Sequence, residues 1–165
     1  MQAPMNSQIY IFSRAIRTGK TTALRNWSGG KPNIAGILTP DENGLRKLYD
    51  ITSGTTYDLQ VAETFPGPVI NIGRFVFDQS VMEKAKQLLL DACYKNTDWL
   101  VIDEVGKLET EQNAGLEPAV TEIIQHYQSG KATGKLLLVI RDSLLDKALE
   151  KYVLKGAVIF SDHLP

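Results

Sequence analysis

Two groups of polar residues in this sequence have the types and spacing to bind and cleave a phosphoanhydride. The first is Gly19-Lys20-Thr21-Thr22, which lies between an apolar run and the beginning of a helical pattern. A glycine-containing turn at a helix N-terminus directs backbone N–H groups toward phosphate oxygens, where the helix dipole also favours negative charge. In such a loop the lysine reaches the β- and γ-phosphates, and the hydroxyl that follows it coordinates Mg²⁺. We therefore expect Lys20 to act in catalysis, Thr21 to bind the metal, and the nucleotide phosphates to contact Arg17, Thr18, Gly19, Lys20, Thr21 and Thr22.

The loop departs from the common G-x-x-x-x-G-K-[ST] pattern at its first position, where Arg14 replaces glycine. A residue with a side chain adopts a positive φ only at a cost, so the loop entrance either follows another backbone course or is strained. Arg14 and Arg17 could each contact phosphate, but solvated arginines are commoner in loops. The rate of turnover therefore depends on a loop entrance that differs from the usual one.

The second group is Asp103-Glu104, directly after an apolar run at residues 99–102. Ligands of α/β sheets bind at the carboxyl ends of strands, so we expect both carboxylates to lie near the phosphate loop. Asp103 is then a Walker B acid that holds Mg²⁺ together with Thr21. Glu104 can polarise a water molecule for attack on the γ-phosphate. An isolated Asp-Glu pair would more simply end a strand in solvent, but this pair and the Lys20 loop both follow apolar runs.

The elements that must position these groups are visible as apolar patterns. Continuous apolar runs are typical of a parallel sheet that is covered on both faces. They predict strands at residues 9–12, 99–102, 136–140 and 157–160, with a weaker candidate at 34–39. Apolar residues at helical spacing predict helices over 81–92 and 116–127 and a shorter one over 144–152.

Strands that alternate with helices of this length predict an α/β fold with a mainly parallel sheet flanked by helices. Period-two alternation on both sides of Ser53-Gly54 predicts an antiparallel hairpin insertion at about residues 45–62. The chain shows no linker or repeat, and 165 residues suit one domain, so we expect a single domain over residues 1–165.

Composition excludes several classes of protein. With 18 basic and 19 acidic residues the net charge is −1, so nucleic acid is not an expected partner. The single Cys93 cannot form an internal disulfide, and with two histidines the chain lacks the ligands of a structural zinc site. No signal peptide or membrane-spanning run is recognisable. These observations favour a cytoplasmic protein and leave any protein partner unspecified.

Residues 101–109, Val-Ile-Asp-Glu-Val-Gly-Lys-Leu-Glu, resemble the hydrophobic-Asp-Glu-Ile-Gly-Lys-Met-Glu signature of a known family. That family comprises the small P-loop nucleoside-triphosphatases of thermophiles, which are represented in humans by the cancer-related nucleoside-triphosphatase. Residues 36–40 and 72–78 also resemble family segments in the same order, so the resemblance covers nearly the whole chain.

The resemblance implies a RecA-like sheet with a hairpin insertion and Mg²⁺-dependent hydrolysis of nucleoside triphosphates to the diphosphate with loose base preference. It also implies that Gly19, Lys20 and Thr21 bind phosphate and metal, that Asp103 binds metal and that Glu104 activates water. The Gly-Pro that usually opens the family's loop is Arg14-Ala15 here.

Two other functions remain open. A nucleotide or small-molecule kinase would use the same loop with an acceptor hydroxyl in place of water, although such a kinase usually has an arginine-rich lid, and here Arg141 stands alone. A nucleotide-binding accessory module with little turnover would fit Arg14 but would have no need of Glu104. The sequence assigns no definite role to Arg74, which could contact phosphate, to Arg141, which could be a sensor, or to Lys107.

Overall fold

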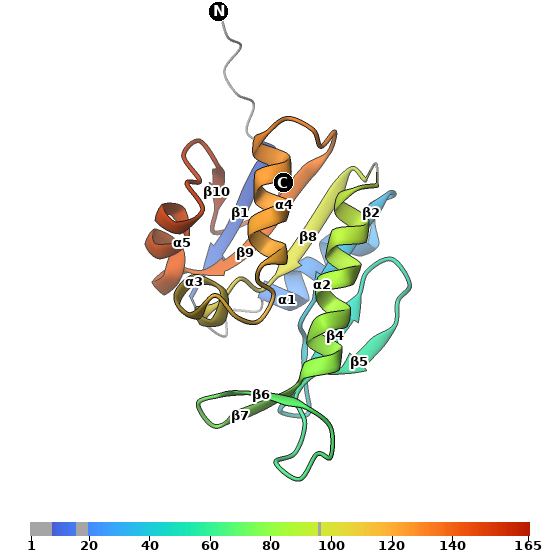
Figure 1. Cartoon of the computed structure of the whole chain (residues 1–165). Helices are drawn as coiled ribbons and strands as arrows, with labels where there is room; N and C mark the ends of the chain where they lie inside the picture. Colours follow the sequence, from blue (N-terminus) through green and yellow to red (C-terminus); the bar gives the residue numbers. More distant parts are fainter. Residues whose placement is uncertain (1–7, 16–19, 96) are drawn as a thin grey trace, which may run out of the picture.

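A five-stranded parallel sheet forms the centre of the computed structural model, which describes residues 8–15, 20–95 and 97–165. The parallel strands lie in the order β10-β1-β9-β8-β2 (Figure 1). They are β10 (Val158–Phe160), β1 (Ile9–Arg14), β9 (Lys135–Arg141), β8 (Trp99–Asp103) and β2 (Ile34–Leu38). All five predicted strands are therefore confirmed, and β1 continues two residues beyond the predicted end, to Arg14.

Antiparallel strands extend the sheet beyond β2. The strand β4 (Leu45–Asp50) pairs antiparallel with β2, and it also pairs with β3 (Asp41–Glu42) and β5 (Thr56–Asp58). The predicted hairpin at about residues 45–62 is thus confirmed as β4 and β5. The fold is a mixed, mostly parallel α/β sheet, and the hairpin continues this sheet rather than standing apart from it.

Helices cover both faces of the sheet, as the continuous apolar runs predict. On one face lie α2 (Gln79–Cys93) and α4 (Ala119–Gln128), and α1 (Lys20–Gly29) lies on the other (Figure 1). The 3₁₀ turn η1 (Asp142–Leu144) leads into α5 (Leu145–Lys151), and the short α3 (Lys107–Gln112) follows β8. None of the helices in the described ranges is long and apolar enough to cross a membrane.

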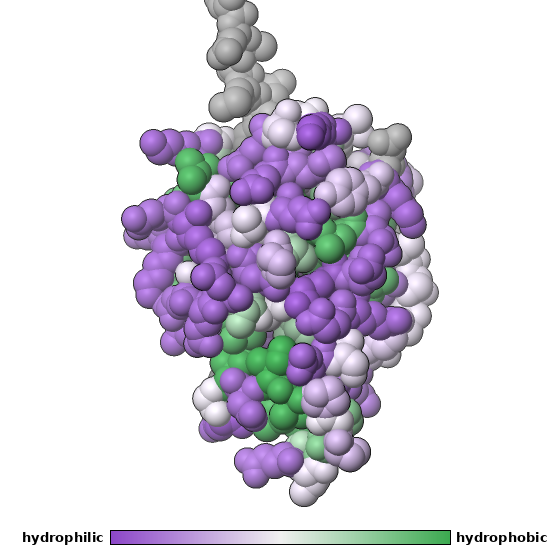
Figure 2. All heavy atoms as spheres, viewed as in Figure 1, coloured by the Kyte–Doolittle hydropathy of each residue, from purple (hydrophilic) through white to green (hydrophobic). Residues whose placement is uncertain are grey.

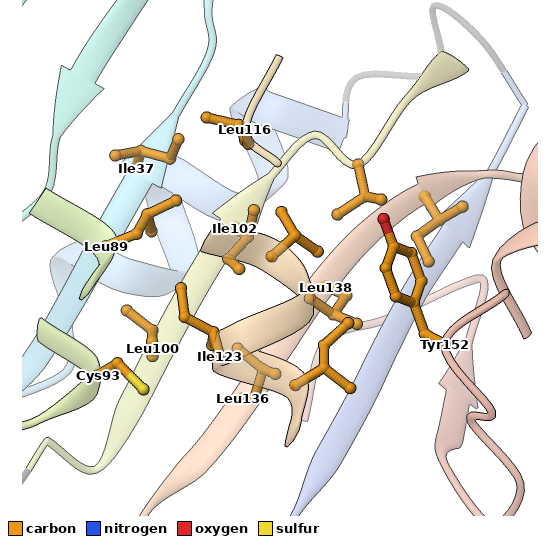
Figure 3. Close-up of a cluster of buried hydrophobic side chains, with 14 of the residues drawn as sticks. Ile37, Leu89, Cys93, Leu100, Ile102, Leu116, Ile123, Leu136, Leu138 and Tyr152 are labelled. Carbon is orange, nitrogen blue, oxygen red and sulfur yellow. The ribbon is translucent and has the colours of Figure 1, made fainter. Parts of the chain in front are cut away.

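Alternate residues of the central strands pack into two separate cores. Leu100, Ile102 and Leu138 join the larger core under α2 and α4 (Figure 3), whereas Val101 and Val139 face α1. Gly36 lets β2 approach β8, because a Cβ at this position would lie 2.1 Å from the Val101 carbonyl oxygen. This close packing fixes the relative positions of the carboxyl ends of β2 and β8.

A second hairpin, β6 (Val69–Ile72) and β7 (Phe75–Asp78), protrudes at the lower end of the molecule in Figure 1. Its turn is Gly73-Arg74, and Gly73 has a φ of 57°. Asp78 then begins α2, because its carboxylate accepts a hydrogen bond from the Ser80 N–H at 2.9 Å and so caps the helix. This second hairpin is not among the elements that the sequence predicted.

Candidate active site

The carboxyl ends of β1, β9 and β8 bring the predicted site residues to one edge of the sheet. Arg14 ends β1, Arg141 ends β9 and Asp103 ends β8. Arg14 is in register with Arg141, and Asp103 is in register with Val139 of β9. Since parallel strands expose their carboxyl ends on the same side, this edge is where a ligand of an α/β sheet is expected.

Thr21 and Asp103, the two predicted metal ligands, are in direct contact. The Thr21 Oγ1 donates a hydrogen bond to Asp103 Oδ2 at 3.0 Å, although the two residues lie 82 positions apart in the chain. The backbone N–H of Thr39, just after β2, donates to the same carboxylate oxygen at 3.1 Å. The loop-to-helix junction and the strand end are therefore joined at one carboxylate.

Asp103 is almost completely buried, with 1% of its surface exposed. The pKa of Asp103 is raised to about 6, chiefly by burial and also by the nearby charge of Glu104. The hydrogen bonds from Thr39 and Thr21 and the nearby charge of Arg46 oppose this rise. A cation at this carboxylate would favour its ionised form.

The donor set at this point suits a hard divalent cation. Magnesium in proteins is held by few protein oxygens and keeps several waters or phosphate oxygens in its shell. The Thr21 hydroxyl and the Asp103 carboxylate are two such oxygens, and their 3.0 Å contact places them close enough to share one ion. A metal site made entirely of protein ligands would need a cluster of three or more acidic, histidine or cysteine side chains. The described part of the chain contains no such cluster.

Glu104 forms an ion pair with Arg141. The Arg141 Nη2 donates to Glu104 Oε1 at 3.2 Å, and the two side chains are 25% and 18% exposed. Within the described residues, the buried Nε of Arg141 has no hydrogen-bond partner. This pairing was not predicted, because it depends on β8 and β9 being neighbours in the sheet. It gives Arg141 a contact with the carboxylate that we expect to activate water.

The loop after Asp103 is held by another buried carboxylate, Glu109, which is 4% exposed. Glu109 accepts hydrogen bonds from the backbone N–H groups of Gly106 at 2.9 Å and Leu116 at 3.1 Å. Gly115 packs against it so closely that a Cβ there would lie 2.0 Å from Glu109 Oε2. Glu109 thus fixes the loop that carries Glu104 and gives a structural reason for its place in the signature.

Arg14 is directed to the C-terminal segment. Its Nε donates to the Ser161 carbonyl oxygen at 2.6 Å, and its Nη2 lies 3.4 Å from the Asp162 carbonyl oxygen. The guanidinium group also lies 5.4 Å from the centre of the Phe12 ring. The residue that replaces the first glycine of the loop therefore joins β1 to the chain end beyond β10.

The remaining loop residues differ in what the structure describes. Arg17, Thr18 and Gly19 lie outside the described residues. Lys20 is the first residue of α1, and Thr22 lies exposed in the first turn of this helix. The predicted strand before this segment and the predicted helix after it are confirmed as β1 and α1. The contacts of Arg17, Thr18, Gly19, Lys20 and Thr22 with phosphate remain predictions.

Comparisons with known proteins agree with this arrangement. THEP1 from the hyperthermophile Aquifex aeolicus has a similar structure, with a TM-score of 0.68, 16% identity, and coverage of 94% of this chain and 90% of that protein. A human cancer-related nucleoside triphosphatase is similar with a TM-score of 0.61, 22% identity, and coverage of 92% and 87%. No curated protein matches the chain.

The family assignment rests on the sequence as well as on the fold. The family model described as NTPase matches residues 11–158, from β1 to the beginning of β10, and so spans every group described above. At 16% and 22% identity the two structures show a shared fold only. The family model adds a match in sequence, which the resemblance of residues 101–109 to the family signature led us to expect. The chain therefore belongs to the NTPase family.

Proposed function

We propose that this protein is a Mg²⁺-dependent nucleoside-triphosphatase that converts a nucleoside triphosphate to the diphosphate and phosphate. The observation that carries the proposal is the contact between Thr21 and Asp103, with Glu104 as the next residue in the chain. It joins a hydroxyl and a carboxylate suited to a divalent cation to a second carboxylate suited to water activation. Membership of the NTPase family supports the same reaction.

In this reaction Thr21 and Asp103 would hold the Mg²⁺ ion, which would supply charge neutralisation at the β- and γ-phosphates. Lys20 contacts the same phosphates, and the backbone at the start of α1 faces them. Glu104 takes a proton from a water molecule, whose oxygen bonds to the γ-phosphorus while the bond to the bridging oxygen breaks. Most of the acceleration then comes from positioning and charge stabilisation.

Arg141 acts in this scheme as a positioning residue for Glu104. A glutamate with free rotamers samples many positions, and an ion pair restricts it to a few. The buried Arg141 Nε has no hydrogen-bond partner among residues 8–15, 20–95 and 97–165, and it can donate to a further acceptor near Glu104. This arrangement lets one guanidinium hold the carboxylate and contact a reacting group.

We propose loose base preference, because all the contacts that support the reaction concern the phosphate and metal end of a nucleotide. We also propose slow turnover, since Arg14 replaces the usual glycine at the loop entrance. The single domain over residues 1–165 and the cytoplasmic location expected from the sequence belong to the same proposal.

The test is phosphate release from ATP, GTP, CTP and UTP with and without Mg²⁺. Lys20→Ala is the control for contaminating phosphatase, because it removes the charge that contacts the phosphates. Mg²⁺-dependent release that is lost in Lys20→Ala supports the proposal, and similar rates with the four substrates support loose base preference. Nucleotide binding without release would instead support an accessory module.

A further inference from the structure

A pocket of about 500 Å³ lies beside Glu104, on the side of β2 and β4. Its walls come from these strands, the β6–β7 hairpin, the first turns of α2, the loop after β8 and the helix α3, with Arg141 at the end of β9. Figure 2 shows hydrophobic residues gathered in the lower part of the molecule, over the region where Figure 1 places the hairpin and the lower end of α2. This volume is in the range of small-molecule binding sites and far exceeds that of a water molecule.

The interior of the pocket is apolar. The buried or half-buried side chains that line it include Ile37, Leu48, Leu59, Phe77, Met82 and Leu116. Activation of a water molecule requires none of these side chains, so their presence next to Glu104 needs another reason. An apolar interior of this size fits the body of an organic molecule.

Positive charge surrounds this interior. Arg46, Arg74 and Lys107 line the pocket, and within the described residues none of the three forms an ion pair. The two carboxylates of the lining are already engaged, Glu104 by Arg141 and Glu109 by two backbone N–H groups. The pocket therefore favours a ligand that carries negative charge.

Two buried polar atoms of the lining residues have no hydrogen-bond partner in the part of the chain that the structure describes. They are the Thr39 Oγ1 and the Arg141 Nε. A buried donor without a partner costs free energy, and a rotation of the side chain toward the pocket would let a ligand that supplies an acceptor recover it. Both atoms belong to residues at the Glu104 end of the pocket, where Thr39 also contacts Asp103 through its backbone.

The pocket is separate from the expected path of the nucleotide. No described residue of β1 or α1 lines it. This inference rests on the proposed function, in which the contact of Thr21 with Asp103 lies at the γ-phosphate end of the nucleotide. In the sheet order β1-β9-β8-β2-β4 most of the pocket lies on the β2 and β4 side of β8, so we expect the nucleoside to extend away from it. Glu104 and Arg141 are then shared by the two sites.

We propose that this pocket binds a second ligand, a small organic anion with an apolar body. Its body occupies the apolar interior, its anionic group is held by Arg74 and Lys107, and its polar end reaches Thr39 and Arg141. The occupant excludes water from Glu104 on this side. Its binding therefore slows hydrolysis without competing with the nucleotide.

The probe is 1-anilinonaphthalene-8-sulfonate, an aromatic anion whose fluorescence rises in apolar sites. Titration of the full chain without nucleotide is expected to show one saturable site. Arg74→Ala should weaken the probe at least fivefold, and Arg74→Lys should restore much of the affinity, because Arg74 lies in the turn of a hairpin and its charge is not needed for folding. The matched control Lys155→Ala changes an exposed residue that does not line the pocket and should bind as the wild type does. Absence of a saturable site, or equal affinity in Arg74→Ala and Lys155→Ala, would overturn the proposal.

A second measurement separates this site from the nucleotide site. Phosphate release at varied Mg²⁺-ATP is followed at several probe concentrations. We expect kcat to fall and KM for ATP to stay constant, with a weaker effect in Arg74→Ala. A rise of KM alone would show that the probe displaces ATP and would overturn the proposal. If the chain releases no phosphate without the probe, the proposed function fails, while the titration still decides whether the pocket binds an organic anion.

Discussion

At the scale of single residues, Asp103 combines a chemical role with a cost in stability. The carboxylate is buried and has two hydrogen bonds, but it forms no ion pair among the described residues. Burial raises its pKa to about 6 from an ordinary value of 3.8. At neutral pH the free protein therefore holds a costly negative charge, which a bound cation would compensate.

We predict that Asp103→Asn stabilises the metal-free protein by about 1 to 3 kcal/mol at pH 7. The advantage should shrink as the pH falls to 5, because the folded protein takes up a proton below about pH 6 whereas the unfolded carboxyl stays ionised to near 3.8. The free energy of unfolding of the wild type therefore decreases as the pH rises from about 3.8 to about 6, and it increases again when the pH is lowered. Urea unfolding in EDTA at both pH values measures this. A wild type more stable than the variant at pH 7 would contradict the prediction.

Glu109 is a second buried carboxylate, and it holds the loop that carries Glu104. Replacement by alanine removes the acceptor of two backbone N–H groups and leaves both without a partner. We expect a loss of about 2 to 4 kcal/mol in the free energy of unfolding, together with slower phosphate release because the Glu104 loop loosens. Chemical unfolding and the release assay test both effects.

The control for Glu109→Ala is Glu111→Ala on the same helix α3. Glu111 forms a more exposed ion pair with Lys147, so its loss should change the free energy of unfolding far less than the loss of Glu109. Equal destabilisation by the two variants would show that Glu109 has no special part in holding the loop.

At the scale of elements, the buried strands were predictable because a strand covered on both faces is a continuous apolar run. The hairpin β6–β7 was not, because its strands are only four residues long, which is too short for a clear periodic pattern. The pairing of Glu104 with Arg141 and the contacts of Arg14 also depend on which strands are neighbours. Sheet order is a long-range property that local spacing does not contain. The contact of Thr21 with Asp103 was predictable only because a sequence motif implied it.

Arg14 provides a prediction at this scale. It joins the end of β1 to the carbonyl groups of Ser161 and Asp162, beyond β10. We expect Arg14→Ala to speed amide hydrogen exchange in residues 158–164 by roughly fivefold or more, with little change in α2 and α4, because local contacts control local opening. Exchange followed by mass spectrometry measures this difference. Unchanged protection of the C-terminal segment would show that Arg14 does not hold it.

At the scale of the whole molecule, a bound nucleotide should stabilise the folded protein, because its proposed contacts join α1 to strand ends that are far apart in the chain. Ligand binding to the folded state alone stabilises by about 2.7 kcal/mol at one hundred times Kd. We therefore predict that Mg²⁺-ADP at this concentration raises Tm by about 5 to 10 °C. Thermal unfolding with ADP, Mg²⁺ or both measures the effect. Equal shifts with ADP in EDTA would contradict a shared metal site.

The most direct test of the account is the comparison of Glu104→Gln with the wild type in ATP turnover and in ATP binding. Glutamine keeps the size of the side chain but cannot take a proton from water. We predict a fall in kcat of at least about 100-fold, with Kd for Mg²⁺-ATP within about threefold of the wild-type value. Turnover that persists in Glu104→Gln would contradict the central claim, as would a loss of turnover that follows entirely from lost nucleotide binding.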